Sequence, residues 1–241
     1  MTHVPEPEEG ETIYIDDIVV PGPVLDLPDP PAGLRWDEVR DYESKALLDV
    51  NGIDSDDLAQ VRDALSHPVD VLVAAAAAVL GMHGDPGGAV ASLVDHPNDH
   101  VQVAAAFALA RNGHASAIDT LAAMLELPLG PYLTAPEAAG CLARLGDTRG
   151  WGVIERALAD PQPAVRIVGA RQLGLFVGLP DCDPWRLYDQ ALEDSDDDVR
   201  WQAAVQLDRI DDPRAGQLLN EIAGAHHDAT LREWAQRHRR A

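Results

Sequence analysis

The chain of 241 residues has little cysteine and few aromatic residues, and Lys45 is its single lysine. Its two cysteines, Cys141 and Cys182, are too few for a disulfide framework or a thiolate zinc site. This usage favours a reducing compartment.

The sequence also lacks a long apolar run. No segment approaches the ~18 apolar residues that a membrane-spanning helix needs. Residues 1–11 contain four glutamates where a secretory leader would be basic and then apolar. We therefore expect a cytoplasmic protein with no membrane contact.

Positive charge is scarce. Eighteen lysines and arginines stand against 41 aspartates and glutamates, which gives a net charge of −23. The field of such a chain repels a phosphate backbone over most of its surface, so we exclude nucleic acid as a partner. A basic partner is favoured instead.

The first 31 residues contain seven prolines and eight carboxylates but no lysine or arginine. This composition buries too little apolar surface to form a core, so residues 1–33 are predicted to be an acidic, proline-rich arm. Within it, residues 12–20 are rich in β-branched side chains and are expected to be extended.

Helical spacing begins after Gly33. A first helix is predicted over 36–50, ended by Asn51-Gly52, and a second is expected to begin near Ser55. Residues 34–66 are therefore predicted to be an N-terminal helical cap.

The next part of the chain repeats itself five times. Anchor residues recur every 29 to 34 positions, small residues follow four and five positions after each anchor, and a leucine follows eight positions after it. The anchors are Leu72, Val101, Thr134, Val165 and Val199, and the leucines are Leu80, Leu109, Leu142, Leu173 and Leu207. Small residues at those positions allow adjacent helices to pack closely.

Each leucine is followed by a turn and a second, shorter helical pattern. Acidic or proline-bearing turns, such as 96–99, 160–163 and 194–198, precede several anchors and suit the start of a helix. The sequence thus predicts five helix-turn-helix pairs over 67–225 that must stack to bury their apolar faces. A capping helix is predicted over 226–241, with Leu231, Trp234 and Ala235 packing inward.

These repeats resemble HEAT repeats, specifically the short HEAT-like form of phycobilisome lyases. The resemblance rests on residues 194–207 followed by Asp211-Asp-Pro-Arg-Ala, on 160–173, and on 138–149. It implies an all-α, right-handed superhelix with the arm at its N-terminus. It also implies that Arg166 and Arg200 join a ladder of aspartates, Asp160 or Asp194 to Asp198. The arginine position is occupied by Val73, Gln102 and Ala135 in the first three repeats.

A helical wheel places offsets 2, 3, 6 and 7 from each anchor on the outward side. Several of these positions are apolar where a solvated face would be polar, with glutamines and Glu137 among them. In HEAT proteins this face is concave, so we expect a partner-binding groove formed by Val103, Phe107, Ile167, Arg171, Trp201 and Val205. The alternative is that these side chains pack against the arm or a neighbouring helix.

Signals for catalysis or metal binding are weak. The chain has no His-Glu pair of the kind that iron-binding HEAT hydroxylases use. His96 and His100 are four residues apart, but Pro97 interrupts the helix there, and His226-His227-Asp228 is interpreted as an exposed turn. We expect no catalytic residue, no metal and no cofactor.

The expected function is that of a non-enzymatic scaffold that binds a protein or peptide of basic character in the concave groove. The alternative is an accessory or lyase-type enzyme subunit that acts on a bound small molecule. A third hypothesis is self-inhibition, in which residues 1–31 fill the groove. The sequence does not indicate an oligomeric state.

Overall fold

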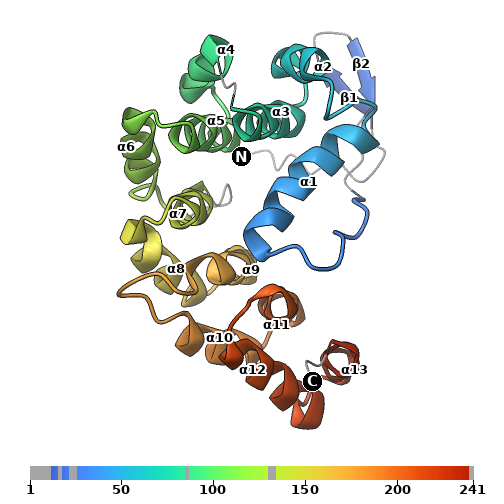
Figure 1. The fold of residues 1–241 in the computed structure, drawn as a ribbon, viewed down its shortest axis with the longest axis vertical. Helices are drawn as coiled ribbons and strands as arrows, with labels where there is room; N and C mark the ends of the chain where they lie inside the picture. The colour runs from blue at the N-terminus through green and yellow to red at the C-terminus, as the bar shows by residue number, and fades with distance from the viewer. Residues whose placement is uncertain (1–11, 16–17, 22–25, 85–86, 130–133, 239–241) are drawn as a thin grey trace. The chain divides into compact units, whose positions relative to one another are not determined.

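The computed structural model describes residues 12–15, 18–21, 26–84, 87–129 and 134–238 (Figure 1). The chain divides into two compact units, one of residues 1–31 and 40–117 and the other of residues 32–39 and 118–241. The first helix, α1 (Trp36–Val50), therefore gives its first four residues to the second unit and the rest to the first.

The arm contains a β-hairpin. β1 (Thr12–Ile15) pairs antiparallel with β2 (Ile18–Pro21), and Ile15 lies opposite Ile18. The β-branched composition that predicted an extended segment also favours strand pairing. The later part of the arm contacts α1. The carbonyl oxygen of Pro28 accepts a hydrogen bond from the hydroxyl of Tyr42 in α1 at 3.4 Å.

The two helices of the predicted cap are present. α1 has the predicted bounds, and the turn that follows it contains Gly52, whose φ of +80° is a conformation that glycine adopts without strain. α2 (Leu58–Asp63) begins three residues later than expected, because Asp57 rather than Ser55 accepts the capping hydrogen bonds. The Ser55 hydroxyl instead donates to Asp49 at 3.2 Å.

All five predicted helix pairs are present. The first helices are α3 (Asp70–Met82), α5 (Asp99–Arg111), α7 (Thr134–Arg144), α9 (Pro163–Gln172) and α11 (Asp197–Ala204). The second helices are α4 (Gly87–Ser92), α6 (Ala115–Met124), α8 (Trp151–Leu158), α10 (Pro184–Leu192) and α12 (Pro213–Ala225), and α13 (Ala229–Arg237) ends the described chain. Short 3₁₀ turns are η1 (Ala64–Ser66), η2 (Leu93–Asp95), η3 (Thr148–Gly150), η4 (Leu173–Phe176) and η5 (Leu207–Arg209).

The all-α helix-pair fold is confirmed. In the first unit α3 packs beside α5, and in the second unit α7, α9, α11 and α13 follow one another as neighbours (Figure 1). The right-handed sense of the superhelix and the segment boundaries at 33, 66 and 225 stay predictions. None of the helices in the described ranges combines the length and the apolar character of a bilayer-spanning segment.

The positions predicted to form the core are buried in every repeat. All five anchors, the small residues four and five positions later, and the leucines eight positions later lie in the interior. The capping helix also packs as predicted, since Leu231, Trp234 and Ala235 are buried. Burial of these side chains is the main favourable contribution to stacking.

Small residues set how closely the first helices approach. A Cβ atom on Gly81 of α3 would lie 2.7 Å from the Cα of Ala108 in α5. Within the third helix pair, a Cβ on Gly150 of η3 would lie 2.6 Å from the Cα of Ala139 in α7. Both distances are shorter than van der Waals contact, so glycine is required at the contact between α3 and α5 and at the contact between η3 and α7.

A side-chain acceptor lies in each described turn before a first helix. It accepts a hydrogen bond from the backbone N–H two residues later. The acceptors are the Nδ1 of His67, His96 and His226, and a carboxylate oxygen of Asp160 and Asp194, at distances of 2.9 to 3.1 Å. Histidine and aspartate are thus interchangeable at this position, which we call the junction acceptor.

The arginine ladder implied by the HEAT resemblance is present in the second unit. Arg166 forms two hydrogen bonds with Asp194, at 2.8 and 2.9 Å, and its third nitrogen donates to the Asp160 carbonyl oxygen. Arg200 donates from one terminal nitrogen to Asp228 at 2.8 Å and from the other to the Asp194 carbonyl oxygen, while its Nε has no hydrogen-bond partner among the described residues. Each arginine therefore ties its own junction turn to the next one.

The ladder extends further than the sequence analysis placed it. Arg232 of α13 donates to the carbonyl oxygens of His226 and His227, the contact that Arg166 makes with Asp160 and Pro161. α13 thus occupies the place of a sixth first helix. In the first unit Gln102 stands in for the arginine by donating to the His96 carbonyl oxygen.

We predict that Gly81→Ala lowers the free energy of unfolding by about 1–3 kcal/mol, because the added methyl collides with the backbone of Ala108. The matched control is Gly88→Ala in α4, where a Cβ meets nothing within 4 Å and alanine is the better helix former by about 0.5–1 kcal/mol. Chemical denaturation measures both. A Gly81→Ala protein as stable as wild type would contradict the close approach of α3 and α5.

We predict that Arg166→Ala lowers the free energy of unfolding by about 3 kcal/mol. Arg166 and Asp194 are both largely buried, and the variant leaves the carboxylate without its partner. Arg166→Lys should recover only part of this, since an ammonium group cannot form the two parallel bonds. A double-mutant cycle with Asp194→Asn isolates the pair. A coupling near zero would exclude the ladder as a stabilising element.

The Arg166–Asp194 pair also makes the free energy of unfolding depend on pH. Burial acts to raise the pKa of Asp194, but the hydrogen bonds from Arg166 and from the Asp196 N–H outweigh it and hold the pKa below its usual value. The stabilisation is therefore complete above the ordinary aspartate pKa of about 3.9 and is lost as pH falls through the lowered value. Unfolding of Arg166→Lys between pH 5 and 2 should show a smaller loss of stability than wild type.

Candidate functional site

The six predicted partner-binding residues do not share one environment. Val103 and Phe107 of α5 are only 4% and 5% exposed, so the expectation that they face an open groove is wrong. The reason is α1. Its residue Asp41 pairs with Arg111 at 3.2 Å, and the Arg111 guanidinium lies over the Phe107 ring, so α1 and Arg111 lie against this side of α5.

The other four residues lie in the second unit. Ile167 and Arg171 are half-buried on α9, and Trp201 and Val205 are half-buried on and just after α11. They stand two and six positions after the anchors of two neighbouring helices and so occupy equivalent repeat positions, and we call them together the α9–α11 face. Their binding role stays a prediction.

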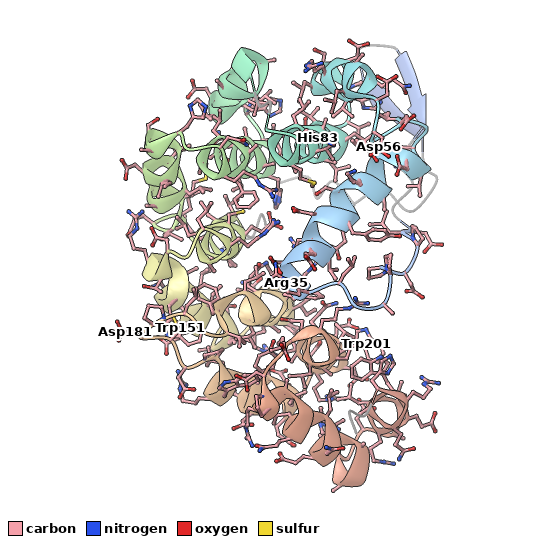
Figure 2. The ribbon with its side chains drawn as sticks, viewed as in Figure 1. Arg35, Asp56, His83, Trp151, Asp181 and Trp201 are labelled. Carbon is pink, nitrogen blue, oxygen red and sulfur yellow. The ribbon has the colours of Figure 1, made fainter. Side chains whose placement is uncertain are left out.

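Trp201 already has an aromatic neighbour. Its ring lies 5.7 Å from that of Trp234 in α13, in an edge-to-face arrangement, and Figure 2 labels Trp201 on α11. Such a pair stabilises by about 0.5–1.5 kcal/mol beyond area burial. Trp201 therefore anchors α13 while leaving part of its surface accessible.

A segment of the chain itself is docked beside these residues. Trp36, 7% exposed, donates from Nε1 to the carbonyl oxygen of Arg171 at 3.1 Å. Arg209 donates to the carbonyl oxygen of Leu34 at 3.3 Å. A Cβ on Gly174 would lie 2.9 Å from the Trp36 ring, so this glycine makes room for the indole.

Gln206 organises the backbone under this segment. Its amide nitrogen donates to the Ala170 carbonyl oxygen at 2.8 Å, and its amide oxygen accepts from the Gly174 N–H at 2.8 Å and from the Tyr188 hydroxyl at 3.0 Å. Tyr188 is fully enclosed, and burial raises its pKa well above the usual value. The tyrosine therefore stays a neutral donor.

The sequence analysis missed this network. It placed Gln172 and Gln206 among outward polar residues, yet they are 2% and 0% exposed. Both stand seven residues after their anchors, where the earlier repeats have Val79, Ala108 and Cys141. A glutamine replacing small or apolar residues at a fixed repeat position was the available signal.

A hollow of about 280 Å³ opens next to Trp36, and we call it the arginine hollow. Arg35, Arg144 and Arg209 line it, together with Trp36, Asp37, Ala143, Gly174, Leu175, Val177, Ile210 and Asp211. Three arginines and two aspartates thus gather in one place. The self-inhibition hypothesis assigned residues 1–31 to the groove, whereas the segment docked in the second unit is 32–39.

One cluster in the described residues has the composition of a metal site. Ligand atoms of Glu193, His226 and His227 lie within 4.8 Å of one another. However, Nδ1 of His226 accepts from the Asp228 N–H at 3.1 Å and Nε2 lies 2.8 Å from the Leu192 carbonyl oxygen, to which it must donate. His226 therefore has no lone pair to offer and acts as a junction acceptor. It is also buried, whereas an exposed turn was expected.

We predict that Trp36→Phe lowers stability by about 1–2 kcal/mol, because the ring still packs but the Arg171 carbonyl oxygen loses its donor. Trp36→Ala should lower the free energy of unfolding by about 3–5 kcal/mol. It should also increase the rate of tryptic cleavage after Arg35, because the segment is then no longer held. Arg35→Ala, whose side chain is 66% exposed, is the control and should change stability by less than about 0.5 kcal/mol. Unchanged stability of Trp36→Ala would mean that the segment is not held.

Two family models match the chain. HEAT repeats match residues 152–238, from α8 to α13, and the PBS lyase HEAT-like repeat matches residues 101–126, which include most of α5 and all of α6. No match was found among curated protein sequences. One solved structure with similarity to the chain is the complex of CpcE and CpcF of phycocyanin lyase from Nostoc sp. PCC7120. The two are 21% identical with a TM-score of 0.49, and the alignment covers 83% of this chain and 81% of that chain. The repeat matches and the stacked helix pairs show that residues 101–126 and 152–238 form HEAT-like repeats, the former of the PBS lyase type.

Proposed function

We propose that the chain is a non-enzymatic protein-interaction module whose second unit binds a segment of a partner protein at the α9–α11 face. The residues assigned to the partner are Ile167, Arg171, Trp201 and Val205. Val103 and Phe107 are no longer included, because both are buried.

The observation that carries the proposal is the docking of the chain's own residues 34–36 in the second unit. Trp36 inserts beside Gly174, and the Arg171 carbonyl oxygen accepts its indole N–H. Apolar contact combined with one oriented backbone acceptor is the chemistry of peptide recognition. A protein segment can use the neighbouring half-buried side chains in the same way.

Charge supports a basic partner. With a net charge of −23, the chain attracts a cationic protein and repels an acidic one. This term increases the rate of encounter more than the final affinity, and it weakens as salt rises. Binding should therefore be strongest at low ionic strength.

The test is affinity capture from native lysate with wild type and with Ile167→Ser combined with Val205→Ser. Both side chains are half-buried, so the variant should fold while losing the apolar contact. Leu127→Ser, which changes an exposed leucine in the turn after α6, is the matched control. We expect one or more proteins to be captured by wild type and by the control but lost from the double variant. Equal capture by all three contradicts the proposal.

The arginine hollow favours a second candidate, an accessory or lyase-type enzyme subunit that acts on a bound small molecule. Three arginines outnumber the two aspartates, Asp37 and Asp211, around this volume of about 280 Å³, which favours a small anionic ligand. The matched repeat model also bears the name of a lyase. Native mass spectrometry of the same purified samples separates the two functions. A bound small molecule that is lost in Arg144→Gln would favour the enzyme subunit.

A further inference from the structure

A second depression in the second unit lies between α10 and α12 and shares no lining residue with the arginine hollow. Its volume is about 310 Å³. The residues that line it are Asp189, Leu192, Glu193, Leu218, Glu221, Ile222, Ala225 and His226. We call it the acidic groove.

The groove has an apolar floor and a charged rim. Leu192, Leu218 and Ile222 are each no more than 4% exposed and form the floor. The carboxylates of Asp189, Glu193 and Glu221 are 53%, 69% and 62% exposed and form the rim. A ligand that fits both must combine an apolar body with a positive charge.

Helix ends add to the negative potential. α10 ends at Leu192 and α12 ends at Ala225, and both of these residues line the groove. The C-terminus of a helix carries a partial negative charge of about half an electron. Two such ends and three carboxylates therefore favour a cation at this place.

The chain already places one guanidinium at this rim. Arg214 lies 3.1 Å from Asp189 of α10 and 3.5 Å from Glu221 of α12 and so bridges the two helices. Glu193 has only imidazoles beside it among the described residues, His226 at 3.9 Å and His227 at 3.6 Å, and these are charged only when protonated. Glu193 is thus the rim carboxylate that has no arginine or lysine paired with it among the described residues.

A bare metal ion does not fit this place. Both ring nitrogens of His226 are engaged in hydrogen bonds, which leaves Glu193 and His227 as ligands. A metal ion would also leave the apolar floor uncovered. An arginine side chain meets both demands, since its methylene stem covers apolar surface and its weakly hydrated guanidinium pairs with a carboxylate.

We propose that the acidic groove binds an arginine side chain of a partner protein, with the guanidinium at Glu193 and the stem over Leu192 and Ile222. This inference rests on the proposed function and narrows it, because it gives the basic partner a specific residue type. It also gives the partner a second point of attachment, on elements other than α9 and α11.

The test is an NMR titration of the full chain with a ten-residue alanine-rich peptide that contains one arginine. The matched probe replaces that arginine by citrulline, which has the same shape and no charge. We expect amide shifts over 189–193 and 218–226 with the arginine peptide, and binding weaker by about tenfold with the citrulline peptide. Equal binding of the two peptides overturns the proposal.

Two variants complete the test. Glu193→Gln should weaken the arginine peptide by about tenfold, because it removes the charge from the hydrogen-bonding partner. Glu126→Gln, at an exposed residue in the turn after α6, is the control and should leave binding unchanged. Equal loss in both variants would mean that only net charge is recognised and would overturn the proposal. The third probe is free N-acetylarginine methylamide. If it binds as tightly as the arginine peptide, the ligand of the groove is a small guanidine rather than a protein, and the proposal of a protein partner is overturned.

The result is separable from the test of the α9–α11 face. If the arginine and citrulline peptides bind equally, but the Ile167→Ser and Val205→Ser variant loses its captured partner, the proposed function stands and only the arginine site is overturned. Success here with unchanged capture in that variant moves the interaction surface to α10 and α12.

Discussion

Close approach between neighbouring first helices is the constraint on which the rest of the structure depends. No single helix pair of this chain buries its own apolar face, so each needs a neighbour at a short distance. Gly81 against Ala108 shows how short that distance is, since even one methyl group does not fit. The pairs of small residues four and five positions after each anchor serve the same need.

The repeats differ in the polar contacts at their junction turns. In the second unit the junctions are joined by the arginines Arg166, Arg200 and Arg232, each contacting the turn before its own helix. In the first unit amides replace them, with Gln102 donating to the His96 carbonyl oxygen and Asn98 donating to Asp70 at 2.9 Å. Charged pairs of this geometry are stronger than neutral ones. The two units thus share a packing scheme but differ in the polar contacts that fix its register.

The sequence predicted the features that recur in every repeat, but it did not predict the contacts that occur only once in the structure. The anchors and leucines were placed correctly because their period reports the face that every repeat buries. Val103 and Phe107 were predicted to be exposed because a helical wheel considers only neighbours within the repeat. The helix that packs against them, α1, lies outside the repeats. Trp36 gave no local signal of its partner, since the Arg171 carbonyl oxygen lies 135 residues away. The buried glutamines were misplaced because polarity was taken as exposure, although Gln206 satisfies its amide inside the protein.

The identity of the junction acceptor gives the stack an uneven response to mild acid. An imidazole nitrogen that accepts a hydrogen bond must be unprotonated, whereas a carboxylate keeps its role down to much lower pH. At His67 burial lowers the pKa, so the neutral form is the folded one, and its contribution is complete above the ordinary histidine pKa of about 6.5 and fades as pH falls through the lowered value. Histidines hold the turns before α3, α5 and α13, and aspartates hold those before α9 and α11. Acidification therefore loosens the turn before α3, where His67 is the acceptor, whereas the lowered pKa of Asp194 keeps the turn before α11 closed to lower pH.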